Sequence, residues 1–258
     1  MKILYFDCSN GISGDMLLKA AADLSGHSDE IYEKINEAAE HGICGGSHHG
    51  HGDCCGGHGS HGADGHDHHD HGHHGHGRSY DEVKNIIAGS RFPEAAKAAA
   101  AAVYANIARA EAKVHGATLE TVHFHEVGRD EAIINALATG MAVSYIETDE
   151  IRTSAIYDGK GTVVCSHGEI SVPVPAVMAL RENCSYDFRT ADVNTEMVTP
   201  SGLAGLMGIG AEPVEPGQDL LAEAKTIKET EAKGGRDTGR PGLKAYILEK
   251  YVLMQGII

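Results

Sequence analysis

The order of apolar and polar positions predicts alternating strands and helices over most of the chain. The apolar run in residues 2–7 (KILYFD) is typical of a buried strand, and the glycines of the following NGISGD end it. Residues 13–24 and 28–42 predict two helices, with Ser13 and Ser28 as their N-caps. The chain therefore begins as strand, helix, helix.

Helical periodicity returns after a long polar gap. The sequence SYDE at 79–82 is a capping-box pattern, and Pro93 lies in the first turn of an alanine-rich helix that Gly116 ends. Residues 130–145 predict another helix. Its apolar stripe consists of Ile133, Ile134, Leu137 and Met141.

The last part of the chain predicts short strands at 151–156, 162–165 and 243–249, with helices that start near Pro175 and Thr199. Together these elements predict an α/β fold, with α+β as the alternative. We expect a mixed sheet flanked by helices.

One segment breaks this pattern. Residues 45–77 are Gly, His, Asp, Ser and Cys with a single alanine, so they bury too little apolar surface to offset the entropy of ordering. We therefore expect a disordered loop that only metal would fold. The expected organisation is 1–44, the start of an α/β domain; 45–78, a His/Gly-rich metal-binding loop; 79–220, the rest of the domain; and 221–258, a linker (EAKGGRDTGRPG) with the start of a truncated C-terminal region.

Composition limits the class of protein. Hydrophobic residues make up 41% of the chain, aromatic residues only 5%, and alanine and glycine abound, which favours close packing of small side chains. The formal net charge of -16 argues against nucleic acid or an anionic membrane as a partner. No membrane span or signal peptide is evident, and six cysteines without a secretion signal indicate reduced thiols and a cytoplasmic protein.

The polar segment contains DGHDHHDHGHHGHG at 64–77. Imidazole is a good ligand for nickel, zinc, copper and cobalt, and Cys54 and Cys55 add soft donors. A loop of this kind lacks the fixed ligand set that catalysis needs, so it predicts capture of divalent metal. The expected ligands are His66, His68, His69, His71, His73, His74 and His76.

A second candidate site is VHFHEVG at 122–128. In an extended segment, His123 and His125 would lie on one face and bind one metal ion, with Glu126 as a base or an outer partner. The alternative is one histidine in the core and one at the surface. His167 is a weaker candidate to join them.

A third candidate is DCSNGISGDM at 7–16, a strand, a glycine turn and a helix start. Amides at such a turn bind phosphate, although neither a P-loop nor a dinucleotide motif is present. The TPSG sequence at 199–202 offers a second helix start, for which plain capping by Thr199 is the alternative.

Taken in order, these motifs resemble the LarC-type nickel insertion proteins. The resemblance rests on DCSNGISGDM, the His-rich loop followed by RSY, EAKVHG with VHFHEVG, HGEISVPVPA and TPSG, which span most of residues 1–210. It implies insertion of Ni²⁺ into pyridinium-3,5-bisthiocarboxylic acid mononucleotide, a lyase-class cyclometallation that forms the nickel-pincer nucleotide cofactor. In that family the reaction depends on CTP, which a C-terminal domain handles with a divalent metal.

The resemblance also implies roles for residues. His123 and His125 would present nickel, and Glu126, His125 or Glu131 would serve in proton transfer. The substrate would be positioned by Gly11, Ser13, Gly14, Asp15 and Thr199.

Where the family carries a second acidic residue, this chain has Asn135. Two interpretations therefore stay open. One is an enzyme or enzyme subunit that needs a separate C-terminal subunit and CTP, and the other is a non-enzymatic nickel store or metallochaperone. Homo-oligomerisation also stays open.

Overall fold

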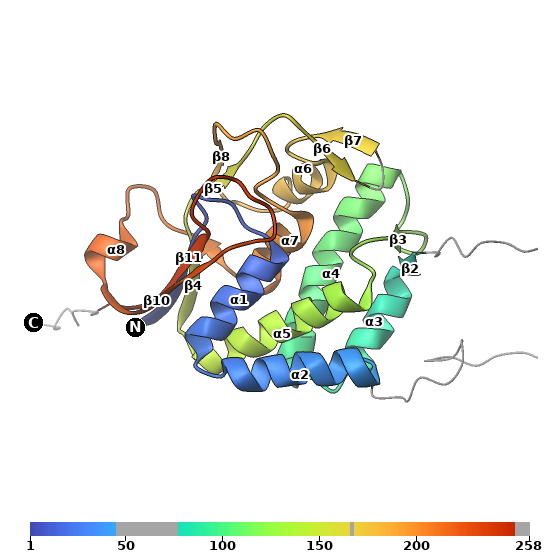
Figure 1. The fold of residues 1–258 in the computed structure, drawn as a ribbon, viewed down its shortest axis with the longest axis horizontal. Helices are drawn as coiled ribbons and strands as arrows, with labels where there is room; N and C mark the ends of the chain where they lie inside the picture. The colour runs from blue at the N-terminus through green and yellow to red at the C-terminus, as the bar shows by residue number, and fades with distance from the viewer. Residues whose placement is uncertain (45–76, 166–167, 251–258) are drawn as a thin grey trace, which may run out of the picture.

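The computed structural model describes residues 1–44, 77–165 and 168–250, and it confirms the α/β class. A mixed five-stranded sheet packs one face against a layer of helices (Figure 1). The elements are β1 Lys2–Asp7, α1 Gly14–Ser25, α2 Ser28–His41, β2 Arg78–Ser79, α3 Tyr80–Gly89, α4 Glu94–His115, β3 His123–Phe124, α5 Asp130–Ile146, β4 Glu150–Thr153, β5 Ile156–Asp158, β6 Thr162–Cys165, β7 Gly168–Ser171, α6 Pro175–Arg181, β8 Phe188–Thr190, α7 Pro200–Gly208, β9 Glu212–Pro213, α8 Leu220–Glu223, β10 Lys225–Ala232 and β11 Leu243–Glu249.

The central sheet has the strand order β10-β11-β1-β4-β9. Strand β1 runs parallel to β4 and antiparallel to β11. Leu4 and Phe6 belong to the main core on the helical side, whereas Ile3 and Tyr5 pack with Leu220 of α8 on the other side. The apolar run that predicted β1 is therefore continuous because both faces of this strand are covered.

Small residues allow the helices to approach closely. A Cβ added at Gly140 of α5 would lie 2.7 Å from the Cβ of Ala99 on α4. One added at Gly208 of α7 would lie 2.4 Å from Cγ2 of Val103, again on α4. The expectation of close packing between small side chains is confirmed.

Most predicted helix boundaries are confirmed. Ser13 and Thr199 cap α1 and α7, and Ser79 forms the capping box of α3. The prediction for Ser28 was wrong, because α2 begins at Ser28 itself, after His27, and has no side-chain cap.

The C-terminal part differs from the expected linker. Residues 225–249 form β10, a loop and β11, and β11 pairs along its length with β1 at the centre of the sheet. Strand β10 was missed because it lies at the sheet edge with mostly exposed, polar residues. The predicted single strand 151–156 is likewise divided into β4 and β5. Among the described residues, no helix combines the length and apolar character of a membrane crossing.

Candidate functional site

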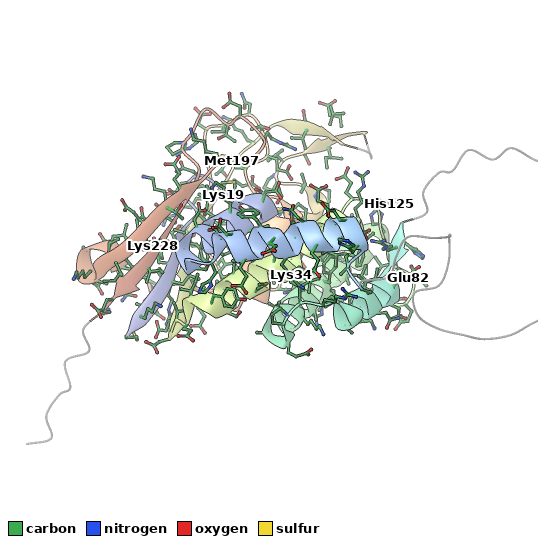
Figure 2. The ribbon with its side chains drawn as sticks, turned by 60° about the horizontal axis from the view of Figure 1, so that its bottom comes forward. Lys19, Lys34, Glu82, His125, Met197 and Lys228 are labelled. Carbon is green, nitrogen blue, oxygen red and sulfur yellow. The ribbon has the colours of Figure 1, made fainter. Side chains whose placement is uncertain are left out.

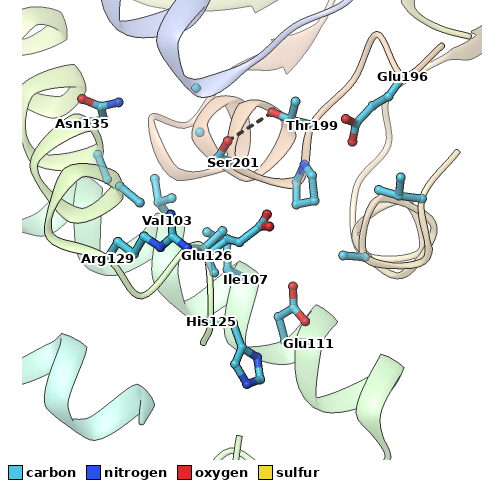
Figure 3. A pocket seen from close by; sticks show the side chains of 18 of the residues that line it. Val103, Ile107, Glu111, His125, Glu126, Arg129, Asn135, Glu196, Thr199 and Ser201 are labelled. Atoms are coloured by element: carbon cyan, nitrogen blue, oxygen red, sulfur yellow. Dashed lines mark hydrogen bonds between the residues drawn. The ribbon is translucent and has the colours of Figure 1, made fainter. Parts of the chain in front are cut away.

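An open cavity of about 630 Å³ lies among α1, α4, α5, α6 and α7. The β6–β7 hairpin and the loop between β10 and β11 complete its wall. Much of the lining is apolar, and polar side chains from distant parts of the chain surround the same space (Figure 3). The cavity therefore brings together some residues of the second and third candidate sites, which lie far apart in the sequence.

The N-termini of α1 and α7 meet at this cavity. The turns that precede them pair with each other: Ile12 N donates to Met197 O at 2.8 Å, and Thr199 N donates to Ile12 O at 3.0 Å. Gly14 and Asp15 at one helix start, and Thr199 at the other, line the cavity.

Gly11 and Ser13 build this arrangement without lining the cavity. Gly11 has φ +85°, and a Cβ there would lie 2.3 Å from Met197 O, so only glycine fits this close approach. The Ser13 hydroxyl accepts from Met16 N at 3.3 Å and caps α1. Both residues therefore act through the backbone that they hold.

The polar residues of the VHFHEVG segment lie in different surroundings. His125 and Glu126 line the cavity, whereas His123 lies outside the lining, with Nδ1 2.9 Å from Thr121 O. Phe124, which lies between the two histidines in sequence, is buried against Tyr104 and holds the segment in place. Figure 2 places His125 far from Lys228 of the sheet edge, at the opposite end of the molecule.

No cluster of three or more His, Cys, Asp or Glu side chains suited to a metal ion occurs within 1–44, 77–165 and 168–250. The assignment of nickel to His123 and His125 stays a prediction. The histidines of the polar tract, and His167, lie outside the described residues.

Helix α5 contributes Glu131 and Asn135 to the cavity. The Asn135 amide Nδ2 donates to Oδ1 of Asp15 at 2.8 Å. This bond joins the start of α1 to α5 and orients the Asp15 carboxylate beside the cavity.

Sequence reasoning missed Glu196, the most deeply buried carboxylate of the cavity. Its side chain is 8% exposed, and its Oε2 lies 3.1 Å from an Arg236 guanidinium nitrogen. Burial raises the pKa of Glu196, and the charges of Asp158 and Glu126 also raise it, while Arg236 opposes them. No motif marks this residue, although it precedes the TPSG sequence by only three positions.

Asp158, at the end of β5, holds the backbone beside Glu196. Its Oδ1 accepts from the amides of Met197 and Val198, each at 3.1 Å, and its Oδ2 lies 3.4 Å from Arg181. Burial raises the pKa of Asp158, and the amide bonds and Arg181 counteract this. The segment that bears Glu196 is thereby fixed from within the core.

Comparison with known proteins gives consistent results. A family model described as "Nickel insertion protein" matches residues 4–225. A "Pyridinium-3,5-bisthiocarboxylic acid mononucleotide nickel insertion protein" of Acetivibrio thermocellus is 34% identical over 93% of this chain and 58% of its own length. One of the same name from Lactiplantibacillus plantarum is 34% identical over 100% of this chain and 64% of its own length. A "Putative nickel insertion protein" of Synechococcus sp. is 33% identical over 79% of this chain and 50% of its own length.

The chain thus spans between about half and two thirds of the length of these relatives. No solved structure matches it.

Proposed function

Because this chain belongs to the nickel insertion protein family, we propose that it takes part in inserting Ni²⁺ into pyridinium-3,5-bisthiocarboxylic acid mononucleotide. The observation that carries the proposal is the convergence of His125, Glu126 and the N-termini of α1 and α7 on one cavity. A volume of about 630 Å³ is within the range of pockets that take small molecules.

The charges of the cavity suit these reactants. Among the residues that the structure describes, five carboxylates line it, against two arginines, Arg129 and Arg236. Those carboxylates belong to Asp15, Glu111, Glu126, Glu131 and Glu196. A net negative lining attracts both Ni²⁺ and a cationic pyridinium ring. The apolar remainder would contact the faces of that ring.

The phosphate of the mononucleotide would bind where α1 and α7 begin. Free amides and the positive end of the helix dipole favour an anion there. Gly14 and Thr199 would face it, while Gly11 and Ser13 keep the α1 turn in place. Asp15 is held by Asn135 and would orient the sugar rather than the phosphate, because its charge repels an anion.

Nickel would reach the cavity through histidine. His125 lines the cavity and would present the ion, and His123 lies two residues away. The His-rich tract would collect nickel and raise its local concentration. Glu126 and Glu131 would support proton transfer from the cavity wall. On this assignment the chain is a cytoplasmic cyclometallase of the lyase class, or a subunit of one.

The relatives are longer than the region that this chain matches. The chain spans 58% of the length of the Acetivibrio relative, so the proposed reaction would also require the relative's unmatched part, together with CTP and its divalent metal. Asn135 favours the second candidate function, a nickel store or metallochaperone. Its amide occupies the neighbourhood of Asp15, where a carboxylate would add a ligand or base.

Nickel transfer distinguishes the two candidates. The nickel-loaded chain is incubated with the mononucleotide and CTP, with and without the unmatched C-terminal part of the Acetivibrio relative, and the nickelated product is sought by mass spectrometry. Product that requires the added part supports a split enzyme. If the added part is active with its own N-terminal part but yields no product here, the chain is a nickel store or carrier.

A further inference from the structure

The cavity contains one carboxylate that differs from the rest in burial. The other acidic groups that face it lie on its exposed rim or are half-buried, whereas the Glu196 side chain is 8% exposed. In Figure 3 its carboxylate turns toward the space that Glu126 enters from the other side. Glu196 therefore lies where a bound ring would exclude water from it.

The position of Glu196 is fixed rather than adaptable. Asp158 binds the amides of the next two residues, Met197 and Val198, each at 3.1 Å. Arg236, from the loop between β10 and β11, pairs with the carboxylate at 3.1 Å. A group held in this way stays in place without reorganising during a reaction.

We propose that Glu196 is the catalytic residue that accepts the ring proton when nickel bonds to the pyridinium carbon, an inference that rests on the proposed function. In this step the C–H bond breaks and its electron pair forms the Ni–C bond. The proton passes to the Glu196 carboxylate, and nickel remains Ni²⁺ throughout. The two thiocarboxylate sulfurs complete the ligand set, so the step needs no oxidant or reductant.

The surroundings of Glu196 favour this role over that of the exposed carboxylates. An aromatic C–H is a weak acid, so its acceptor benefits from a basicity above that of an ordinary carboxylate. Burial and the neighbouring charges of Asp158 and Glu126 supply this by disfavouring the ionised form. Arg236 pairs with the carboxylate and lowers its pKa, which favours the ionised form that can accept a proton.

The test is the nickel-transfer reaction with Glu196→Gln, which keeps the shape of the side chain and removes the base. We expect kcat to fall about 10²- to 10⁴-fold, with nearly unchanged KM and nickel content. Glu182→Gln is the matched control, because Glu182 pairs with Lys113 on the outer surface and does not line the cavity. A ring-deuterated substrate should show a larger isotope effect with the variant.

A second variant keeps the Glu196 carboxylate and changes the charge beside it. Arg236→Gln removes the cation that lowers the pKa of Glu196, so the rise of kcat with pH should move to higher pH. This measurement decides the role even if Glu196→Gln fails to fold.

The outcomes separate the two proposals. If the wild-type chain makes product and Glu196→Gln matches it, Glu196 is not the base and the proposed function stands. A variant that changes only KM, or loses nickel, makes Glu196 a binding residue and also overturns the assignment. If the wild-type chain makes no product with a competent C-terminal part, both the proposed function and this inference are wrong.

Discussion

The side chains of Asn135 and Asp15 are joined by a hydrogen bond of 2.8 Å from Nδ2 to Oδ1. The bond connects α5 to the first turn of α1, 120 residues away, at the edge of the cavity. The amide at position 135 is therefore a hydrogen-bond donor to the Asp15 carboxylate. It removes the repulsion that two carboxylates at this distance would produce.

Restoring a carboxylate at position 135 should destabilise the free protein. Asn135→Asp is expected to lower the free energy of unfolding by about 1 kcal/mol at pH 7.5. The loss should shrink when added Ni²⁺ bridges the two carboxylates. Urea denaturation with and without Ni²⁺ measures this.

Asn106→Asp is the control for that change. It adds the same charge on α4, but next to Arg109, which already donates to the Asn106 side chain at 3.2 Å. No loss of stability is expected there. An equal loss in both variants would mean that net charge, and not the Asp15 contact, sets the effect.

The turn before α1 should tolerate only glycine at position 11. Gly11→Ala is expected to cost about 3 kcal/mol, because φ is +85° and the new Cβ would lie 2.3 Å from Met197 O. Gly26→Ala is the matched control, since φ is +77° and nothing lies within 4 Å of its Cβ. That variant should lose only about 1 kcal/mol, the cost of the left-handed conformation. Thermal or chemical unfolding of the pair compares them, and equal losses would refute the close contact.

The stability of the protein should depend on pH through Glu196. Its folded-state pKa is raised above the ordinary glutamate value of 4.5, so the folded state holds this proton more tightly than the unfolded state does. The wild type therefore loses this contribution as pH rises from about 4.5 through the folded-state pKa. Glu196→Gln lacks the titration, so its stability relative to wild type should increase over that window.

Urea denaturation between pH 4 and pH 7.5 tests the sign of this effect. Arg236→Gln should extend the pH range over which stability falls to higher pH, because Arg236 lowers the pKa of Glu196. A relative stability of Glu196→Gln that falls with rising pH would contradict the assignment of a raised pKa.

The His-rich tract and the cavity should bind nickel independently. Deleting residues 45–77 is expected to reduce the number of nickel ions bound while sparing one tighter site. Equilibrium dialysis with metal analysis counts the ions. Adding His123→Ala and His125→Ala to the deletion should then remove the remaining site. If the deletion alone abolishes all binding, the proposed role of these two histidines is wrong.

The elements that depend on local signals could be predicted from the sequence. Short sequence patterns predict capping by Ser13, Ser79 and Thr199, because a cap contacts residues only a few positions away. Strand β1 and the apolar stripe of α5 could be predicted because the apolar positions in the sequence match the positions that each element buries. The resemblance to nickel insertion proteins also rested on contiguous motifs, and the family match bears it out.

What the sequence alone determined was therefore the α/β class, most helix boundaries and the family. The tertiary structure decided which polar groups meet: His125 without His123, Asn135 with Asp15, and Glu196 with Arg236. It also placed β10 and β11 in the sheet, although their polar loop resembles a linker. Asn135 and Asp15 are 120 positions apart in the sequence, and no local pattern encodes contacts of this kind. Burial, which distinguishes Glu196 from the other glutamates, arises only once the chain has packed around it.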